Sequence, residues 1–397
     1  MTGFAVVLLA ATVPLQQSDT LTLERAIESA RRIRPQLAYI GSVTAEARGR
    51  AGIAGAVPNP VLQYKHAETS PTSEANLEQR LDWIFARWPE RGAARAGVRG
   101  AQADSARLEA ELVRDVRIAF FQAVAASLAY ELAFGNGASA DSLTTIAARR
   151  VTSGDISVLE REQFAVEAGR LRQLLYRAVE AREIARAGLA RATGNPAATG
   201  AVLSGALDAG LNTSWPARPG SEELPLLRRA LADSATEHGL YRATTIRRFP
   251  IPSLILGRKW DEGSPFAGGT DAILGFTVPV PIWNIGSAPA AVARARAERA
   301  AALAGEARLE AQRLLDEGES RLLNTRVRAL FTRDSLLPRA VRLRAGAVRL
   351  YRAGETGVLP VFDALRVERE IALGYIQDLL AWQVALSDWL VLLGRTQ

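Results

Sequence analysis

The residue types that carry out most protein chemistry are scarce in this chain. It has no cysteine, only two histidines (His66 and His238), and no methionine after Met1. Without cysteine there are no disulfides, thiolate metal sites or cysteine nucleophiles, and two distant histidines offer neither a zinc site nor a Cys–His pair. No glycine-rich loop is followed by Lys and Ser or Thr, and no serine has nucleophile-elbow spacing. We therefore expect no catalytic residue, no cofactor and no metal site, and a protein that is not an enzyme.

Several acidic residues lie near two predicted turns, at Gly154 and Gly354. Each turn separates two long stretches with helical periodicity. After the first turn come Asp155 and Glu160. Ser157 and Glu160 have the spacing of a capping box. One interpretation is therefore that Glu160 only caps the helix that follows the turn.

The chain is 48% hydrophobic with only 6% aromatic residues, which favours long Ala- and Leu-rich helices. These helices would position the two turns. Apolar residues recur at helical spacing, so the sequence predicts a mainly α fold with a small β part. We expect the helix 89–151 to be interrupted at Gly135-Asn136-Gly137. After the apolar run at the start of the chain, we expect no transmembrane helix. The expected helices cover residues 23–55, 89–151, 154–192, 224–248, 290–352 and 358–393.

Two segments instead alternate apolar and polar residues with a period of two, which predicts strands of about ten residues, the length that crosses a membrane. They are Glu74–Trp83 and Asp271–Val280, and each pairs with a weaker segment, Val61–Ala67 or Ser253–Trp260, around a polar loop. We expect Asn76 and Glu78 to face a lumen. The residues expected to face lipid are Leu77, Leu81, Leu274 and Phe276.

Landmarks recur at a nearly constant offset, which indicates an internal duplication. At an offset of 200, Trp83 matches Trp283, Gly154 matches Gly354, and Gly194 matches Gly394. Each half reads helix, strand hairpin, long helix, tight turn and returning helix. The expected organisation is a first repeat at 20–194 with a hairpin at 59–83, a linker at 195–221, and a second repeat at 222–397 with a hairpin at 252–282.

The start of the chain predicts export. Residues 1–19 hold a short apolar run that suits a secretory signal, although no basic residue precedes Arg25. The net charge is +7, from 49 basic and 42 acidic residues, but the arginines are dispersed among Glu and Asp. This pattern favours a solvated helix surface over nucleic-acid binding.

Four strands cannot close a barrel, since the smallest membrane barrels need about eight. An open sheet would leave unpaired edges in hydrocarbon. Either several chains share one barrel, or the strands are an ordinary surface hairpin with tryptophans near its ends. Trp83, Trp88, Trp260 and Trp283 lie where an interfacial aromatic girdle would be.

The order and doubled spacing of several short motifs resemble the TolC-like outer-membrane efflux channels, from Leu21 to Gly394. The matching residues are Leu23-Glu24-Arg25-Ala26, Pro35-Gln36-Leu37, Val57-Pro58-Asn59-Pro60, Leu81-Asp82-Trp83, Arg91-Gly92-Ala93, Val278-Pro279-Val280-Pro281-Ile282-Trp283-Asn284 and Tyr351-Arg352-Ala353-Gly354-Glu355 with Asp363-Ala364. The Pro-Asn-Pro and Leu-Asp-Trp forms are most similar to the heavy-metal (cobalt, zinc, cadmium or copper) branch.

The resemblance implies a homotrimer whose chains each give four strands to one twelve-stranded barrel in the outer-membrane lipid. The long helices would form a periplasmic tunnel that docks a periplasmic adaptor and an inner-membrane pump. The turns would be the tip, with Asp363, Glu160, Asp155 and Glu355 as candidates for a pore constriction. Asp363 could instead be a surface charge that faces Arg366 of a neighbouring chain.

A second class remains open, namely a periplasmic coiled-coil scaffold or adaptor that never enters a membrane. Within the channel class, multidrug export and type I protein secretion are alternatives to metal export. The sequence does not separate these substrates, because in such systems the adaptor and the pump select them.

Overall fold

The computed structural model describes residues 20–68, 73–154, 156–260, 270–283 and 285–396, so the predicted signal segment and Asp155 lie outside the described residues. The chain forms two compact units, each assembled from separate stretches. We call them the turn unit and the sheet unit. The turn unit takes its described residues from Met1–Arg34, Leu112–Trp215 and Arg321–Ser387, and the sheet unit from Pro35–Glu111, Pro216–Ser320 and Asp388–Gln397.

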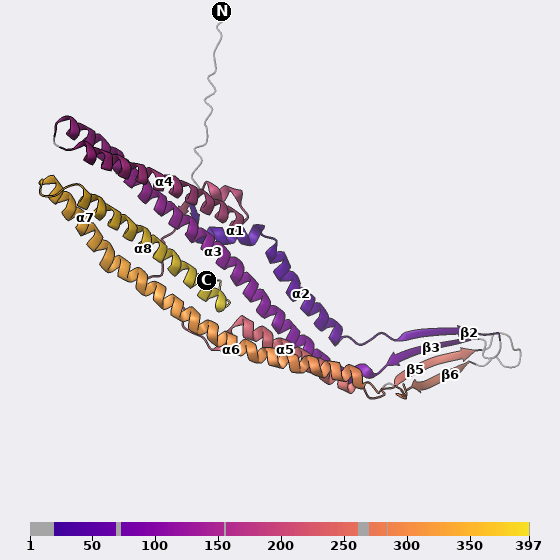
Figure 1. Ribbon diagram of the computed structural model, residues 1–397. Coiled ribbons are helices and arrows are strands. Elements are labelled where there is room, and N and C mark those ends of the chain that lie inside the picture. The colour runs from indigo at the N-terminus through magenta and orange to yellow at the C-terminus, as the bar shows by residue number, and fades with distance from the viewer. Residues whose placement is uncertain (1–19, 69–72, 155, 261–269, 284, 397) are drawn as a thin grey trace, which may run out of the picture. The chain divides into compact units, whose positions relative to one another are not determined.

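The sheet unit contains a four-stranded antiparallel sheet in the order β2-β3-β5-β6 (Figure 1). Its strands are β2 (Val61–His66), β3 (Ser73–Arg80), β5 (Ser253–Trp260) and β6 (Asp271–Thr277). The two hairpins are therefore confirmed as neighbours in one sheet. β3 and β6 end earlier than the alternation predicted, because Asp82 already begins a helix and Pro279 and Pro281 have no N–H to donate to a strand ladder.

The sheet unit also contains α2 (Gln36–Gly55), α5 (Pro225–Ile246), α6 (Ser287–Phe331) as far as Ser320, and α3 (Asp82–Thr152) as far as Glu111. The predicted single helix 23–55 is wrong, since it is broken into α1 and α2 at Arg34-Pro35. The cause is local: the residue before a proline is disfavoured in the α conformation, and Arg34 is extended with ψ of 128°.

The turn unit contains α1 (Leu23–Ile33), the rest of α3 and of α6, α4 (Val158–Thr193), α7 (Leu337–Arg352) and α8 (Leu359–Leu392) as far as Ser387. The predicted break at Gly135-Asn136-Gly137 is wrong, because α3 is continuous through it. A Cβ at Gly137 would lie 3.7 Å from Leu175 of α4, an ordinary contact distance, so α3 packs beside α4 here without any need for a glycine. The predicted helix 290–352 is interrupted by a π-helical turn at Thr332–Leu336, just before Pro338, which cannot donate a backbone hydrogen bond.

Of the predicted linker 195–221, residues 195–215 are folded into the turn unit, and the rest belongs to the sheet unit. The part in the turn unit contains η1 (Pro196–Thr199) and β4 (Val202–Ser204), which pairs in parallel with β1 (Thr20–Thr22). Leu207 and Leu211 are fully buried, and Gln383 of α8 donates to the carbonyls of Leu207 and Ala209 at 2.9 and 2.8 Å. A buried amide with two acceptors fixes this segment on α8.

One charged side chain enters the turn-unit interior. Burial lowers the pKa of the Arg117 guanidinium, while Glu24 opposes that change. Arg117 Nε donates to Ser387 Oγ at 3.3 Å, and its guanidinium lies 5.9 Å from the Phe121 ring centre. These partners compensate a cation that would otherwise be costly to bury.

Among the described residues, one helical stretch within Asp82–Gly137 of α3 is long and apolar enough by composition to cross a membrane, which corrects the expectation that no such stretch exists. Core helices pass the same test. Val116, Phe120 and Ala123 are buried side chains of this helix, although only 33% of the apolar stretch is buried.

Candidate functional site

One face of the sheet carries a row of four leucines, one from each strand. Leu62 pairs with Leu77, Leu77 with Leu256, and Leu256 with Leu274. Because side chains alternate across a strand, residues paired in register share one face. We call this the apolar face. It also holds Leu254 and Phe276, which pair with each other.

The predicted lipid-facing residues Leu77, Leu274 and Phe276 lie together on the apolar face, with Leu274 and Phe276 about three-quarters exposed (77% and 76%). Leu81 does not join them. It follows the end of β3, is half-buried, and its N–H donates to the Pro252 carbonyl at 3.3 Å. Sequence analysis missed Leu62 and Leu256, although the same period of two in the weaker segments would have found them.

The other face, here called the polar face, holds six charged side chains. Lys65, Glu74, Lys259 and Asp271 form one row in register, and Lys259 Nζ lies 3.6 Å from Asp271 Oδ2. Glu78 accepts from Gln63 at 3.0 Å. The charged side chains are thus concentrated on this face, although it also holds Val61, Ile255 and Ile273.

Asn76 is on the polar face, but its side chain is buried against the neighbouring strand. It is only 8% exposed and lies directly over Gly257 of the neighbouring strand, where a side chain would collide with it. Asn76 Nδ2 donates to Glu74 Oε1, whereas Asn76 Oδ1 has no partner among the described residues.

Aromatic residues lie beyond both ends of the leucine row. At the helix end, Trp283 is 92% exposed, and Trp88 and Phe249 are also exposed. At the opposite end, the Tyr64 and Trp260 rings meet with centres 6.4 Å apart. Trp83, by contrast, is half-buried, with the Arg87 guanidinium 5.5 Å from its ring centre.

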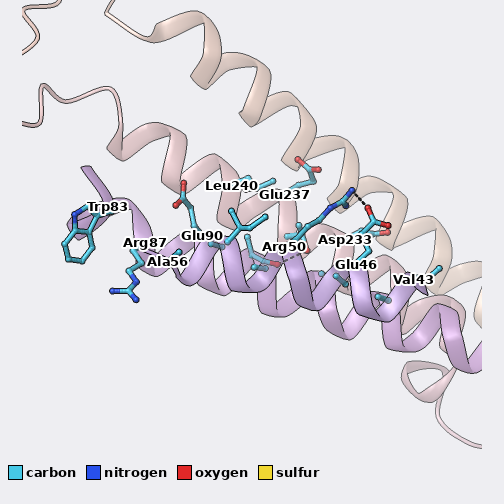
Figure 2. Close-up of a pocket in the computed structure, with 18 of the residues that line it drawn as sticks. Val43, Glu46, Arg50, Ala56, Trp83, Arg87, Glu90, Asp233, Glu237 and Leu240 are labelled. Carbon is cyan, nitrogen blue, oxygen red and sulfur yellow. Dashed lines mark hydrogen bonds and ion pairs between the residues drawn. The ribbon is translucent and has the colours of Figure 1, made fainter. Parts of the chain in front are cut away.

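A cleft of about 820 Å³ lies between α2, α3 and α5 in the sheet unit, as Figure 2 shows. Its floor is a line of small residues on α3, Ala94, Gly97 and Ala101, at helical spacing. Sequence analysis did not identify it, although that spacing of small residues was a visible signal.

Most charges in the cleft are paired. Arg229 bridges Asp104 at 2.7 Å and Asp233 at 2.8 Å, and Arg247 lies 2.7 Å from Glu90. The cleft residues include no serine, cysteine or histidine, so the cleft offers no nucleophile of those types.

The two turns have the same backbone geometry. Gly154 has φ of 80° and Gly354 has φ of 76°, a left-handed conformation that favours glycine. After the first turn, Ser157 and Glu160 form both hydrogen bonds of a capping box, so Glu160 caps α4. Glu355 is exposed in the second turn, where its N–H donates to the Leu350 carbonyl at 3.0 Å.

Asp363 is exposed on α8 and bonded within its own chain, since Arg366 Nη2 donates to its Oδ1 at 2.9 Å. It lines a shallow groove of about 420 Å³ between α4 and α8, together with Leu159 and Phe362. Glu160 is not among the residues lining this groove. The structure of a single chain thus places Asp363 and Glu160 on different helices and does not pair them.

An apolar cluster joins the two turns, which sequence analysis did not foresee. Phe164 of α4 and Phe362 of α8 meet edge to face with ring centres 4.9 Å apart, beside buried Ala147 and Val358. We call these residues the turn cluster.

Two ion pairs lie further along the same helices. Glu167 of α4 lies 3.5 Å from Arg369 of α8, and both are largely buried. Arg344 of α7 lies 2.7 Å from Glu368 of α8. In the described part of the chain, no group of three or more His, Asp or Glu side chains could hold a metal ion.

Solved structures that are similar to this chain include outer-membrane proteins. CusC, whose crystal structures concern transmembrane channel formation, matches with a TM-score of 0.75 and 16% identity over 94% of this chain and 92% of its own. The outer membrane protein VceC of Vibrio cholerae gives 0.77 and 15%, over 94% and 97%. The open state of the outer membrane channel MtrE of Neisseria gonorrhoeae gives 0.69 and 18%, over 94% and 89%.

No protein-family model and no curated protein sequence matches the chain. At these identities the structural likeness establishes a shared fold. The fold implied by the TolC-like resemblance is therefore confirmed, with long helices and a small β part.

Proposed function

We propose that this chain is the subunit of an outer-membrane channel, the exit duct of a tripartite efflux system, and that it conducts its substrate passively. The observation that carries the proposal is the two-faced sheet. A row of four leucines crosses one face while six charged side chains occupy the other. Such a surface suits lipid on one side and water on the other.

The sheet also needs partners. In the described sheet β2 and β6 are the edge strands, and open edges are not tolerated in hydrocarbon. Three copies would supply twelve strands, within the range of membrane barrels. A homotrimer would satisfy the edges of every copy.

The helical hairpins would form the periplasmic part of the duct, with the Gly154 and Gly354 turns at the end that meets an adaptor and an inner-membrane pump. Support comes from the shared fold with outer-membrane channels and from the matched geometry of the two turns. The proposed role is transport without catalysis.

The substrate class rests on the sequence resemblance alone. The Pro58-Asn59-Pro60 and Leu81-Asp82-Trp83 motifs favour heavy-metal cations, with drugs or secreted proteins as the alternatives. Deleting the gene and measuring sensitivity to cobalt, zinc, cadmium and copper salts tests this choice, with a panel of drugs as the comparison. Co-transcribed adaptor and pump genes would point to the same substrate.

Fractionation and conductance test the channel itself. The expressed protein should need detergent for extraction, run as a heat-modifiable trimer, and give discrete conductance steps in a planar bilayer. A protein that stays in the soluble fraction and gives no conductance would instead support the periplasmic scaffold.

A further inference from the structure

Arg258 is the exception to the division of charge across the sheet. Lys65, Glu74, Glu78, Arg80, Lys259 and Asp271 all fall on the polar face, and Arg258 is the single Asp, Glu, Lys or Arg of the described strands on the apolar face. It is exposed, and no hydrogen bond or ion pair joins it to another described residue.

Its position in the sheet is towards the loop end. Arg258 is two residues beyond Leu256 along β5 and two before Trp260, which ends the strand. A guanidinium at the midplane of a bilayer is costly, whereas at the interface the cost nearly vanishes because the group reaches water and headgroups.

The surroundings of Arg258 are those of a membrane interface. Its register partners on both sides are small, Ala75 on β3 and Ala272 on β6, which leaves room beside the guanidinium. On the far side of Ala75 lies Tyr64, whose ring meets that of Trp260. Tyr and Trp rings prefer the headgroup level of a bilayer.

We propose that Arg258, with the Tyr64–Trp260 ring pair, binds the phosphate of a phosphorylated outer-leaflet lipid. This inference rests on the proposed channel function, which places the loop end of the sheet at the outer surface. A guanidinium matches a phosphate with paired donors, and the aromatic pair offers an amphipathic surface to the rest of the headgroup. The site would hold a lipid against the outside of the barrel rather than a substrate inside it.

The test compares lipid retention by four proteins: wild type, R258Q, R258K and K259Q. K259Q is the matched control, since it removes the neighbouring positive charge from the polar face. Each protein is reconstituted in nanodiscs of a phosphate-free glycolipid doped with lipid A or with dephosphorylated lipid A, so that lipid A carries the only lipid phosphate. Native mass spectrometry then counts the lipid A molecules that stay on each trimer.

Wild type and K259Q should retain the phosphorylated lipid, and R258Q should retain roughly tenfold less, as expected for one lost charge-assisted hydrogen bond. R258K should keep part of the retention, and the dephosphorylated lipid should not be retained by any protein. Equal retention by wild type and R258Q would overturn the site, and so would complete displacement of the lipid by free inorganic phosphate. If the wild-type protein conducts but retains both forms of lipid A equally, only the lipid site is wrong. If it does not enter the bilayer, the proposed channel function is wrong as well.

Discussion

At the scale of single residues, the missing side chain of Gly257 determines how the polar face is built. A Cβ there would lie 2.7 Å from the Ala75 carbonyl oxygen and would collide with the Asn76 side chain. Because one of these obstacles is backbone in a paired strand, the sheet cannot give way easily. Gly275, on the same face of β6, has only Ile255 Cβ nearby, at 4.0 Å.

We therefore expect Gly257→Ala to destabilise the sheet by about 1–3 kcal/mol, the usual range for overpacking. Gly275→Ala is the control and should change little. The measurement is the temperature at which the trimer band dissociates in semi-native electrophoresis. Identical dissociation temperatures for the two variants would show that the Asn76–Gly257 contact has no effect on stability.

Asp363 gives the second residue-scale prediction. Its carboxylate is partly neutralised by Arg366 of its own chain, so the two side chains should act in opposite directions on cations at the tip. Asp363→Asn should weaken block by multivalent cations and lower cation selectivity in planar bilayers, whereas Arg366→Gln should strengthen block. Glu160→Gln can keep the capping box, because Gln also suits its N3 position, so it should remove only a favourable charge from the first turn of α4, about 0.3–1 kcal/mol. If neither Asp363→Asn nor Arg366→Gln changes block in an assembled trimer, the constriction lies elsewhere.

At the scale of elements, the apolar face can be tested strand by strand. Leu77→Arg or Leu274→Arg should each oppose insertion by about 2–4 kcal/mol near the bilayer midplane. Glu78→Arg, one residue along on the polar face, should be tolerated because that face would meet water. Asn76→Arg is not a fair control, because Asn76 is buried over Gly257. The amount of each variant in the outer-membrane fraction measures the effect, and equal amounts of Leu77→Arg and Glu78→Arg would mean that the sheet does not cross a membrane.

The turn cluster couples α4 to α8. Phe164→Ala and Phe362→Ala should each destabilise the turn unit, and a double-mutant cycle should give a coupling of about 0.5–1.5 kcal/mol for the edge-to-face pair. Denaturant unfolding followed by circular dichroism measures the cycle. Strictly additive effects would show that the two rings do not stabilise each other.

Elements whose cause is local were predictable from the sequence, and those that depend on distant packing were not. Gly154 and Gly354 mark both turns because a left-handed residue is favoured there, and Ser157 with Glu160 marks the start of α4. The burial of Leu207, by contrast, depends on Gln383, 176 residues away. The turn cluster also combines segments that carry no shared sequence signal. The continuity of α3 through Gly135 and Gly137 shows the same effect, since tertiary packing overrides glycine's low helix propensity.

At the scale of the whole molecule, α8 is shared between the two units. Residues up to Ser387 belong to the turn unit, and those from Asp388 onwards belong to the sheet unit. In the first, Trp382 donates to the Ala209 carbonyl at 3.3 Å, and in the second Trp389 donates to the Pro216 carbonyl at 3.1 Å. Both indole rings are almost fully buried. One helix therefore supplies a central side chain to each core.

The shared helix has a consequence for the order of folding during synthesis. Arg117 cannot form its hydrogen bond until Ser387, 270 residues later, has been synthesised. Neither core can be complete before α8 has left the ribosome. The nascent chain should therefore travel with exposed apolar surface and depend on holding chaperones until its last helix arrives. A chain that ends at Leu380 should remain sensitive to protease throughout, whereas one that ends at Arg395 should become as resistant as the full chain. Pulse-labelled protein challenged with protease would record the difference, and early resistance of the shorter chain would show that a core closes without α8.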